Sequence, residues 1–92
     1  MTRYLIERVY AEAEEEAMLD IGHRSKQAAE QLPDVTWEHS HVVSDESGIK
    51  SYCIYEAPNH EMLHEHATRV GGHTIKRIYE IAGDVTPSDF PD

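Results

Sequence analysis

The residues best suited to chemistry in this 92-residue chain are seven histidines and a single cysteine. Residues 51–66, SYCIYEAPNHEMLHEH, hold Cys53 and three of the histidines beside several glutamates. Imidazole and thiolate groups are the ligands that zinc, nickel and copper prefer in proteins. This stretch therefore indicates metal binding or acid–base chemistry, and the other elements must be read for how they position it.

Within that stretch, residues 60–64, HEMLH, match the H-E-x-x-H pattern of zinc proteases. In that pattern two imidazoles bind zinc from one helix face and the glutamate is the general base. Here Pro58 starts the helix, so His60 falls in its first turn, and His60 and His64 lie towards solvent. We expect no protease. The pair could bind a divalent metal weakly at the surface with a neighbouring glutamate, and a merely solvated helix face explains it as well.

A second group of candidate ligands is predicted inside the fold. His39 and His41 lie on one predicted strand, Cys53 lies on the next, and His66 lies on the helix that follows. Together these four side chains would suit zinc, nickel or copper. The alternative is that Cys53 is a small buried hydrophobic residue and that the histidines are hydrogen-bonded at the edge of the core.

Composition narrows the classes of function. The formal net charge is −10, from 18 acidic and 8 basic residues. This balance argues against binding to nucleic acid or to anionic membranes, because phosphate groups are neutralised by clustered Lys and Arg. The start, MTRYLIERVY, has charges where a signal peptide would be apolar, and no apolar run reaches transmembrane length. One cysteine permits no internal disulfide and suits a reducing compartment, so we expect a cytoplasmic protein.

The predicted elements follow the order β-α-β-β-α-β. Apolar alternation predicts strands over residues 3–10, 35–43, 49–57 and 73–82. A first helix opens on three glutamates and ends before Pro33, and a second, over about 59–70, ends at Gly71-Gly72. This order is typical of the ferredoxin-like α+β fold, a four-stranded antiparallel sheet with two helices on one face. We expect one domain over residues 1–83 and an irregular tail over 84–92.

The register of the central hairpin decides which side chains share a face. Residues 45–48, DESG, predict a type I turn with Asp first and Gly fourth. We therefore expect Asp45 to pair with Ile49. In that register His41 faces Cys53, and His39 lies on the same face, beneath the helices.

The opposite face of the sheet would then carry Val42, Tyr52 and Ile54. These side chains are too apolar to stand fully in solvent. Since a sheet needs both of its apolar faces covered, we expect a homodimer that covers this face or exchanges edge strands.

Several segments resemble a known family. They are Tyr4-Leu5-Ile6-Glu7-Arg8, Trp37-x-x-Ser40, Tyr52-Cys53-x-Tyr55-Glu56-Ala57-Pro58, His66-Ala67 and Gly71. In this order and spacing they are similar to a family of small bacterial proteins of unknown function, typified by a nickel-binding, nickel-responsive protein. The resemblance covers about residues 4–82 and is most specific over 52–58. It implies a ferredoxin-like fold, a dimer and metal binding, although this chain has His41 where the family commonly has tyrosine.

Three functions follow from these observations. The leading hypothesis is a cytoplasmic homodimer that binds nickel or zinc through histidine and is not an enzyme. The first alternative is an enzyme of the dimeric α+β-barrel kind, which would hold haem or a small aromatic substrate between helices and sheet. His66 or His41 would then be the axial ligand or the general base. The second alternative is an interaction module without catalysis.

Overall fold

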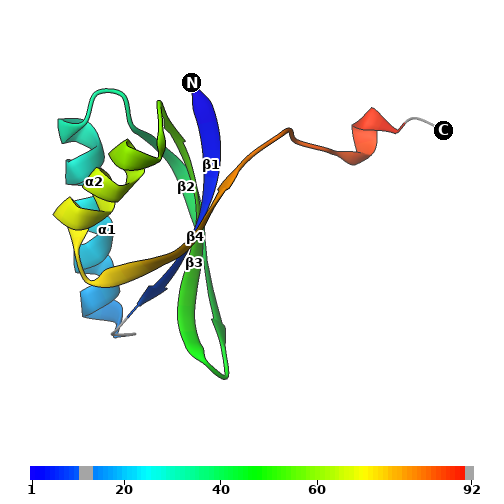
Figure 1. The fold of residues 1–92 in the computed structure, drawn as a ribbon. Coiled ribbons are helices and arrows are strands. Elements are labelled where there is room, and N and C mark those ends of the chain that lie inside the picture. The colour runs from blue at the N-terminus through cyan, green and yellow to red at the C-terminus, as the bar shows by residue number, and fades with distance from the viewer. Residues whose placement is uncertain (11–13, 91–92) are drawn as a thin grey trace.

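The computed structural model describes residues 1–10 and 14–90. Its elements are β1 (Thr2–Tyr10), α1 (Glu15–Gln31), β2 (Thr36–Asp45), β3 (Gly48–Ala57), α2 (His60–Val70), β4 (His73–Glu80) and a short 3-10 helix, η1 (Pro87–Asp89). Both α-helices cover the same face of the sheet (Figure 1). The predicted ferredoxin-like α+β fold is confirmed. No helix of the described residues is long and apolar enough to cross a membrane.

The sheet is antiparallel throughout, with the strand order β2-β3-β1-β4. The first strand of the chain therefore lies in the centre, hydrogen-bonded to both β3 and β4. β1 carries apolar side chains on both faces of the sheet, and Ile6, on the helix side, is completely buried.

Local signals set the ends of the helices. α1 begins with Glu15 and Glu16, whose carboxylates complement the positive end of the helix dipole. It ends at Gln31, because Pro33 cannot continue it. In α2 the Asn59 side chain accepts a hydrogen bond from the Met62 amide at 3.0 Å, which satisfies one of the free amides of the first turn.

The core consists of two apolar clusters with polar side chains between them. The larger cluster is made by Tyr4, Ile6, Leu32, Val35, Cys53, Tyr55, Ala57 and Leu63. The smaller is made by Ile21, Ala28 and Val70, with Tyr10 packed against it. On β1, Ile6 belongs to the larger cluster and Tyr10 contacts the smaller, so Arg8, which shares their face, lies between the two.

The predicted register of the β2–β3 hairpin is wrong. Asp45 pairs with Gly48, because the Asp45 carboxylate accepts hydrogen bonds from the Ser47 amide at 2.8 Å and the Ser47 hydroxyl at 2.6 Å, which close the reversal in two residues. His41 consequently pairs with Tyr52, and Ser40 takes the predicted place of His41 opposite Cys53.

A register irregularity between Trp37 and His39 completes the correction. Trp37 pairs with Tyr55 but His39 pairs with Ile54, so one extra residue of β2 lies between them, as in a β-bulge. From His39 onward each side chain of β2 lies on the face opposite to the one predicted. His39 and His41 therefore lie on the face without helices, and Val42, predicted to lie there, is on the helix side opposite Ser51.

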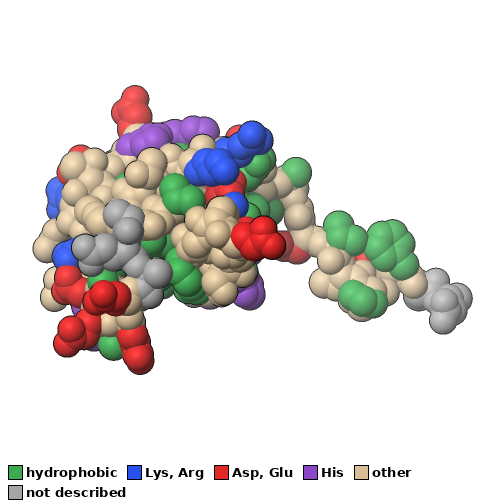
Figure 2. Space-filling model, turned by 90° about the horizontal axis from the view of Figure 1, so that it is seen from below, with side chains coloured by type: hydrophobic (Ala, Val, Ile, Leu, Met, Phe, Trp, Pro, Cys, Tyr) green, Lys and Arg blue, Asp and Glu red, His purple; other side chains and the backbone are tan. Residues whose placement is uncertain are grey.

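The C-terminal residues leave the sheet and extend away from it (Figures 1 and 2). The Ile81 amide donates to the Arg3 carbonyl at 2.9 Å, and Arg3 also pairs with Asp84. Beyond that point η1 forms one capped turn inside the segment predicted to be irregular. Val85 and Phe90 on this tail are 72% and 70% exposed.

The turn between α2 and β4 yields a first prediction. Gly72 has a φ of +74°, and a Cβ added there would lie 3.1 Å from Nη2 of Arg24 and 3.2 Å from Cδ1 of Ile21. We expect Gly72→Ala to lower the free energy of unfolding by about 1–3 kcal/mol, from backbone strain and crowding together. Urea denaturation followed by circular dichroism measures it.

Two other glycines are controls for that experiment. Gly71 has a φ of +67° but open space around it. Gly71→Ala therefore isolates the effect of backbone strain and should lower the free energy of unfolding by less than Gly72→Ala. Gly83 lies in open space and its φ is not positive, so Gly83→Ala should be close to neutral. Equal stability of Gly72→Ala and Gly83→Ala would contradict the packing described for this turn.

Candidate functional site

His39 and His41 lie together on the face of the sheet without helices. Both are exposed, and their rings meet edge to face with centroids 5.2 Å apart. Residues two apart on a strand project from the same face, so the two imidazoles are adjacent on one surface. Imidazole suits nickel, zinc and copper, and this pair offers two such ligands to one ion.

The helix pair, His60 and His64, is less well arranged to hold one metal ion, because the two rings have different surroundings. The His60 ring packs edge to face against Tyr4, with centroids 5.1 Å apart. His64 instead lines a shallow depression of about 380 Å³ at the junction of α2 and β4, together with His73. Across residues 1–10 and 14–90, no three His, Cys, Asp or Glu side chains are grouped so that they could hold a metal ion.

His66 is completely buried and its tautomer is set by the backbone. One ring nitrogen, Nε2, lies 2.9 Å from the Ser25 carbonyl. A carbonyl only accepts, so Nε2 carries the proton and Nδ1 carries the lone pair. Burial, reinforced by the charge of Arg8, lowers the pKa of His66 to about 4. His66 is therefore neutral at pH 7.

Cys53 lies beside a cation rather than among ligands. Its sulfur is 3.2 Å from the Ser51 hydroxyl and accepts from Nη1 of Arg8 at 3.7 Å. Two like unit charges about 4 Å apart repel by about 4 kcal/mol in a protein of intermediate dielectric constant, and a divalent ion would be repelled more strongly. The guanidinium thus opposes a metal at Cys53, and His39 and His41 lie across the sheet from it. The structure does not bring the four predicted internal ligands together.

The group that sequence reasoning missed is centred on Arg8. This side chain is 2% exposed and lies on the helix side of the central strand. Nη1 donates to the Tyr55 hydroxyl at 3.3 Å, and Cζ lies 5.0 Å from the centre of the Tyr55 ring, a cation–π contact. The sequence held one signal: Arg8 alternates with Ile6 and Tyr10 and so occupies a core-facing position of an apolar strand.

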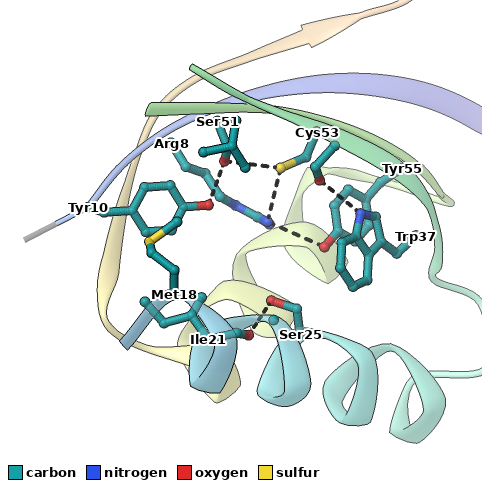
Figure 3. Close-up of a pocket in the computed structure, with 12 residues that line it drawn as sticks. Arg8, Tyr10, Met18, Ile21, Ser25, Trp37, Ser51, Cys53 and Tyr55 are labelled. Carbon is teal, nitrogen blue, oxygen red and sulfur yellow. Dashed lines mark hydrogen bonds between the residues drawn. The ribbon is translucent and has the colours of Figure 1, made fainter. Parts of the chain in front are cut away.

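A cavity of about 110 Å³ opens beside Arg8, between α1 and the sheet (Figure 3). Its walls are mainly apolar or aromatic and include Tyr10, Met18, Ile21, Trp37 and Tyr55. Figure 3 shows the guanidinium directed along the sheet towards Cys53 and Tyr55. Pockets for drug-sized ligands and cofactors measure about 300–1,000 Å³, so this cavity is too small for a haem.

The tyrosines near the guanidinium are neutral at pH 7. Burial raises the pKa of Tyr55 to about 12, although Arg8 acts in the opposite direction. Burial also raises the pKa of Tyr10, whose hydroxyl is hydrogen-bonded to that of Ser51. The Tyr55 hydroxyl therefore solvates Arg8 without cancelling its charge.

The fold and these sites define a small ferredoxin-like α+β protein with an exposed histidine pair on one face of the sheet and a buried arginine on the other. The family model for "Nickel responsive protein SCO4226-like" matches residues 4–81. The chain belongs to this family.

A solved structure gives the same fold. The crystal structure of SCO4226 from Streptomyces coelicolor A3(2) matches 90% of this chain and 99% of its own, with a TM-score of 0.63 and 21% sequence identity. At that identity the likeness concerns the fold. A search of the curated proteins gave no match.

The buried His66 yields a prediction on pH. Since its pKa is lowered from 6.5 to about 4, the unfolded chain takes up a proton first as the pH falls. This contribution to stability is present above pH 6.5 and is lost progressively below it, so from pH 7 to pH 5 we expect the free energy of unfolding to fall by about 1–2 kcal/mol. Urea denaturation across this range measures the loss.

Two variants isolate the His66 contribution. His66→Gln retains a donor for the Ser25 carbonyl and removes the titration, so its stability should depend less on pH between 7 and 5. His23→Gln changes an exposed histidine of α1 and should retain the wild-type dependence. Parallel pH profiles for wild type and His66→Gln would refute the assignment.

Proposed function

We propose that this protein binds nickel, or a related divalent transition metal such as zinc, through the His39–His41 pair, as a cytoplasmic homodimer without catalytic activity. The observation that carries the proposal is the adjacency of two exposed imidazoles, 5.2 Å apart, on the face of the sheet without helices. The family description supports nickel as the metal. The net charge of −10 favours any cation near the surface.

The two imidazoles of one protomer leave coordination positions open. Nickel and zinc sites use four or more ligands, and the described residues offer no third His, Cys, Asp or Glu beside the pair. A second copy of the chain, packed on the same face, can supply a second pair. We therefore propose that the metal site is shared between protomers and is completed by the dimer.

The outer face of the sheet has the character of an interface. Leu5, Tyr52 and Ile54 lie there partly buried with no helix above them, and Tyr79 is 44% exposed. The tail adds the exposed Val85 and Phe90, carried away from its own domain (Figure 2). Packing two copies on this face would remove these apolar surfaces from water, which is the main driving force of association.

Metal binding is tested by calorimetric titration of tag-free protein with Ni²⁺ and Zn²⁺ at pH 7.5. We expect His39→Ala with His41→Ala to weaken nickel binding by at least about tenfold, because half or more of the ligands are lost. Binding should also weaken as the pH falls, since an imidazole must be neutral to ligate and protons compete with the metal.

The helix histidines provide the matched control. His60→Ala with His64→Ala removes the same number of imidazoles from α2 and should leave nickel affinity within about twofold. If the helix double variant loses binding and the strand double variant does not, the proposed site is wrong. If wild-type protein shows neither heat nor a higher melting temperature with either metal, the proposed function is wrong, because an ion bound only by the native state must stabilise it.

The dimer is tested separately by light scattering at micromolar concentration. We expect wild type to have the mass of two chains and Ile54→Glu to shift it to one, because the change places a charge in the apolar centre of the proposed interface. Leu19→Glu makes a similar change at a 58% exposed position of α1 and should stay dimeric. A wild-type monomer in the presence of nickel would contradict the shared site.

A further inference from the structure

The Arg8 guanidinium has one edge without a protein partner. Nη1 is occupied by the Tyr55 hydroxyl and the Cys53 sulfur. Nε and Nη2 are buried and have no hydrogen-bond acceptor within reach among the described residues. A buried donor that lacks an acceptor is costly, and it is more costly when the donor is charged. The free edge is therefore a place where an added acceptor would be stabilising.

The geometry of that edge selects the acceptor. Nε–H and Nη2–H are parallel donors on one side of the planar guanidinium, and the two oxygens of a carboxylate match them in a bidentate pair. Burial acts to lower the pKa of Arg8, but the interactions with Tyr55 and Cys53 leave it above its ordinary value, so the side chain is cationic. No carboxylate within 4 Å of Arg8 is found in the described part of the chain.

The cavity that Arg8 lines sets the size and character of a ligand that pairs with its guanidinium. Its volume is about 110 Å³ and its walls are mostly apolar. An engineered cavity of about 150 Å³ in another protein binds benzene. The smaller cavity of this protein therefore has room for a ligand of only a few carbon atoms. Gly22 lines it, and a Cβ added there would meet no heavy atom within 4 Å. The glycine thus leaves open the wall that α1 presents to the cavity.

We propose that this cavity is a binding site for a short aliphatic monocarboxylate of about three or four carbons, whose carboxylate pairs with the Arg8 guanidinium and whose alkyl chain lies against Trp37 and Tyr55. The proposal is independent of the metal site, which lies on the other face of the sheet. It assigns a ligand, and no chemical step, to the helix side of the fold.

Trp37 provides the measurement, because it lines the cavity and is the only tryptophan of the chain. Metal-free protein is titrated with sodium propionate and sodium butyrate at constant ionic strength while its fluorescence is followed. Saturation-transfer NMR on propionate is a second readout that does not depend on Trp37. We expect saturable binding with a Kd on the order of millimolar or below, no response to propionamide, and at least tenfold weaker binding of sulfate and phosphate.

Two variants of the cavity and one control identify the site. Arg8→Met removes the charge, and Gly22→Leu fills the cavity from α1 while replacing glycine by a better helix former. Each should weaken propionate binding by at least tenfold. Gly22→Leu keeps the test decisive if Arg8→Met fails to fold. Arg77→Met removes an exposed arginine of β4 and should leave binding unchanged.

Three outcomes overturn the proposal. The first is the absence of saturable propionate binding by both readouts. The second is unchanged propionate binding in Gly22→Leu, which would place the ligand elsewhere. The third is binding of sulfate or phosphate as tight as that of propionate, which would make Arg8 a general anion site.

Discussion

A cation held in the middle of the sheet, with no carboxylate beside it among residues 1–10 and 14–90, is the constraint on which the described sites depend. Arg8 is 2% exposed on the central strand, and burying an uncompensated charge is costly. The protein offsets part of that cost with the ring and hydroxyl of Tyr55 and the sulfur of Cys53. The same guanidinium separates the two apolar clusters and repels any metal from Cys53, and it adds to the burial that lowers the pKa of His66.

The element order could be predicted from the sequence because each element carries its own local signal. Apolar alternation marks the strands, Pro33 ends α1, and Asn59 with the glycine pair bounds α2. These signals act over a few residues and do not depend on tertiary contacts. The order of the elements then left few topologies open.

The candidate site was predicted less well, because it depends on one register. From Glu38 to His41 the strand holds no strongly apolar side chain that would be costly to turn outward, so a one-residue shift has little effect on burial. The bulge near Glu38 and the two-residue turn after Asp45 decide the outcome, and the histidines move to the outer face. Arg8 could have been found by asking which charged residue alternates with core positions. The cavity beside it could not, since a void depends on how α1 packs against the sheet.

The strand order also governs how the chain assembles during synthesis. β1 is made first but pairs with β3 and β4, so it has no neighbour on either side until residues 48–57 and then 73–80 have been made. The β2–β3 hairpin and α1 are local and form early, whereas closing the sheet around β1 is a long-range event and therefore slow. A nascent chain that stops short of His73 presents a hydrophobic central strand with one bare edge, which is the kind of surface that pairs with other chains and aggregates. Completion of β4 covers that edge of β1.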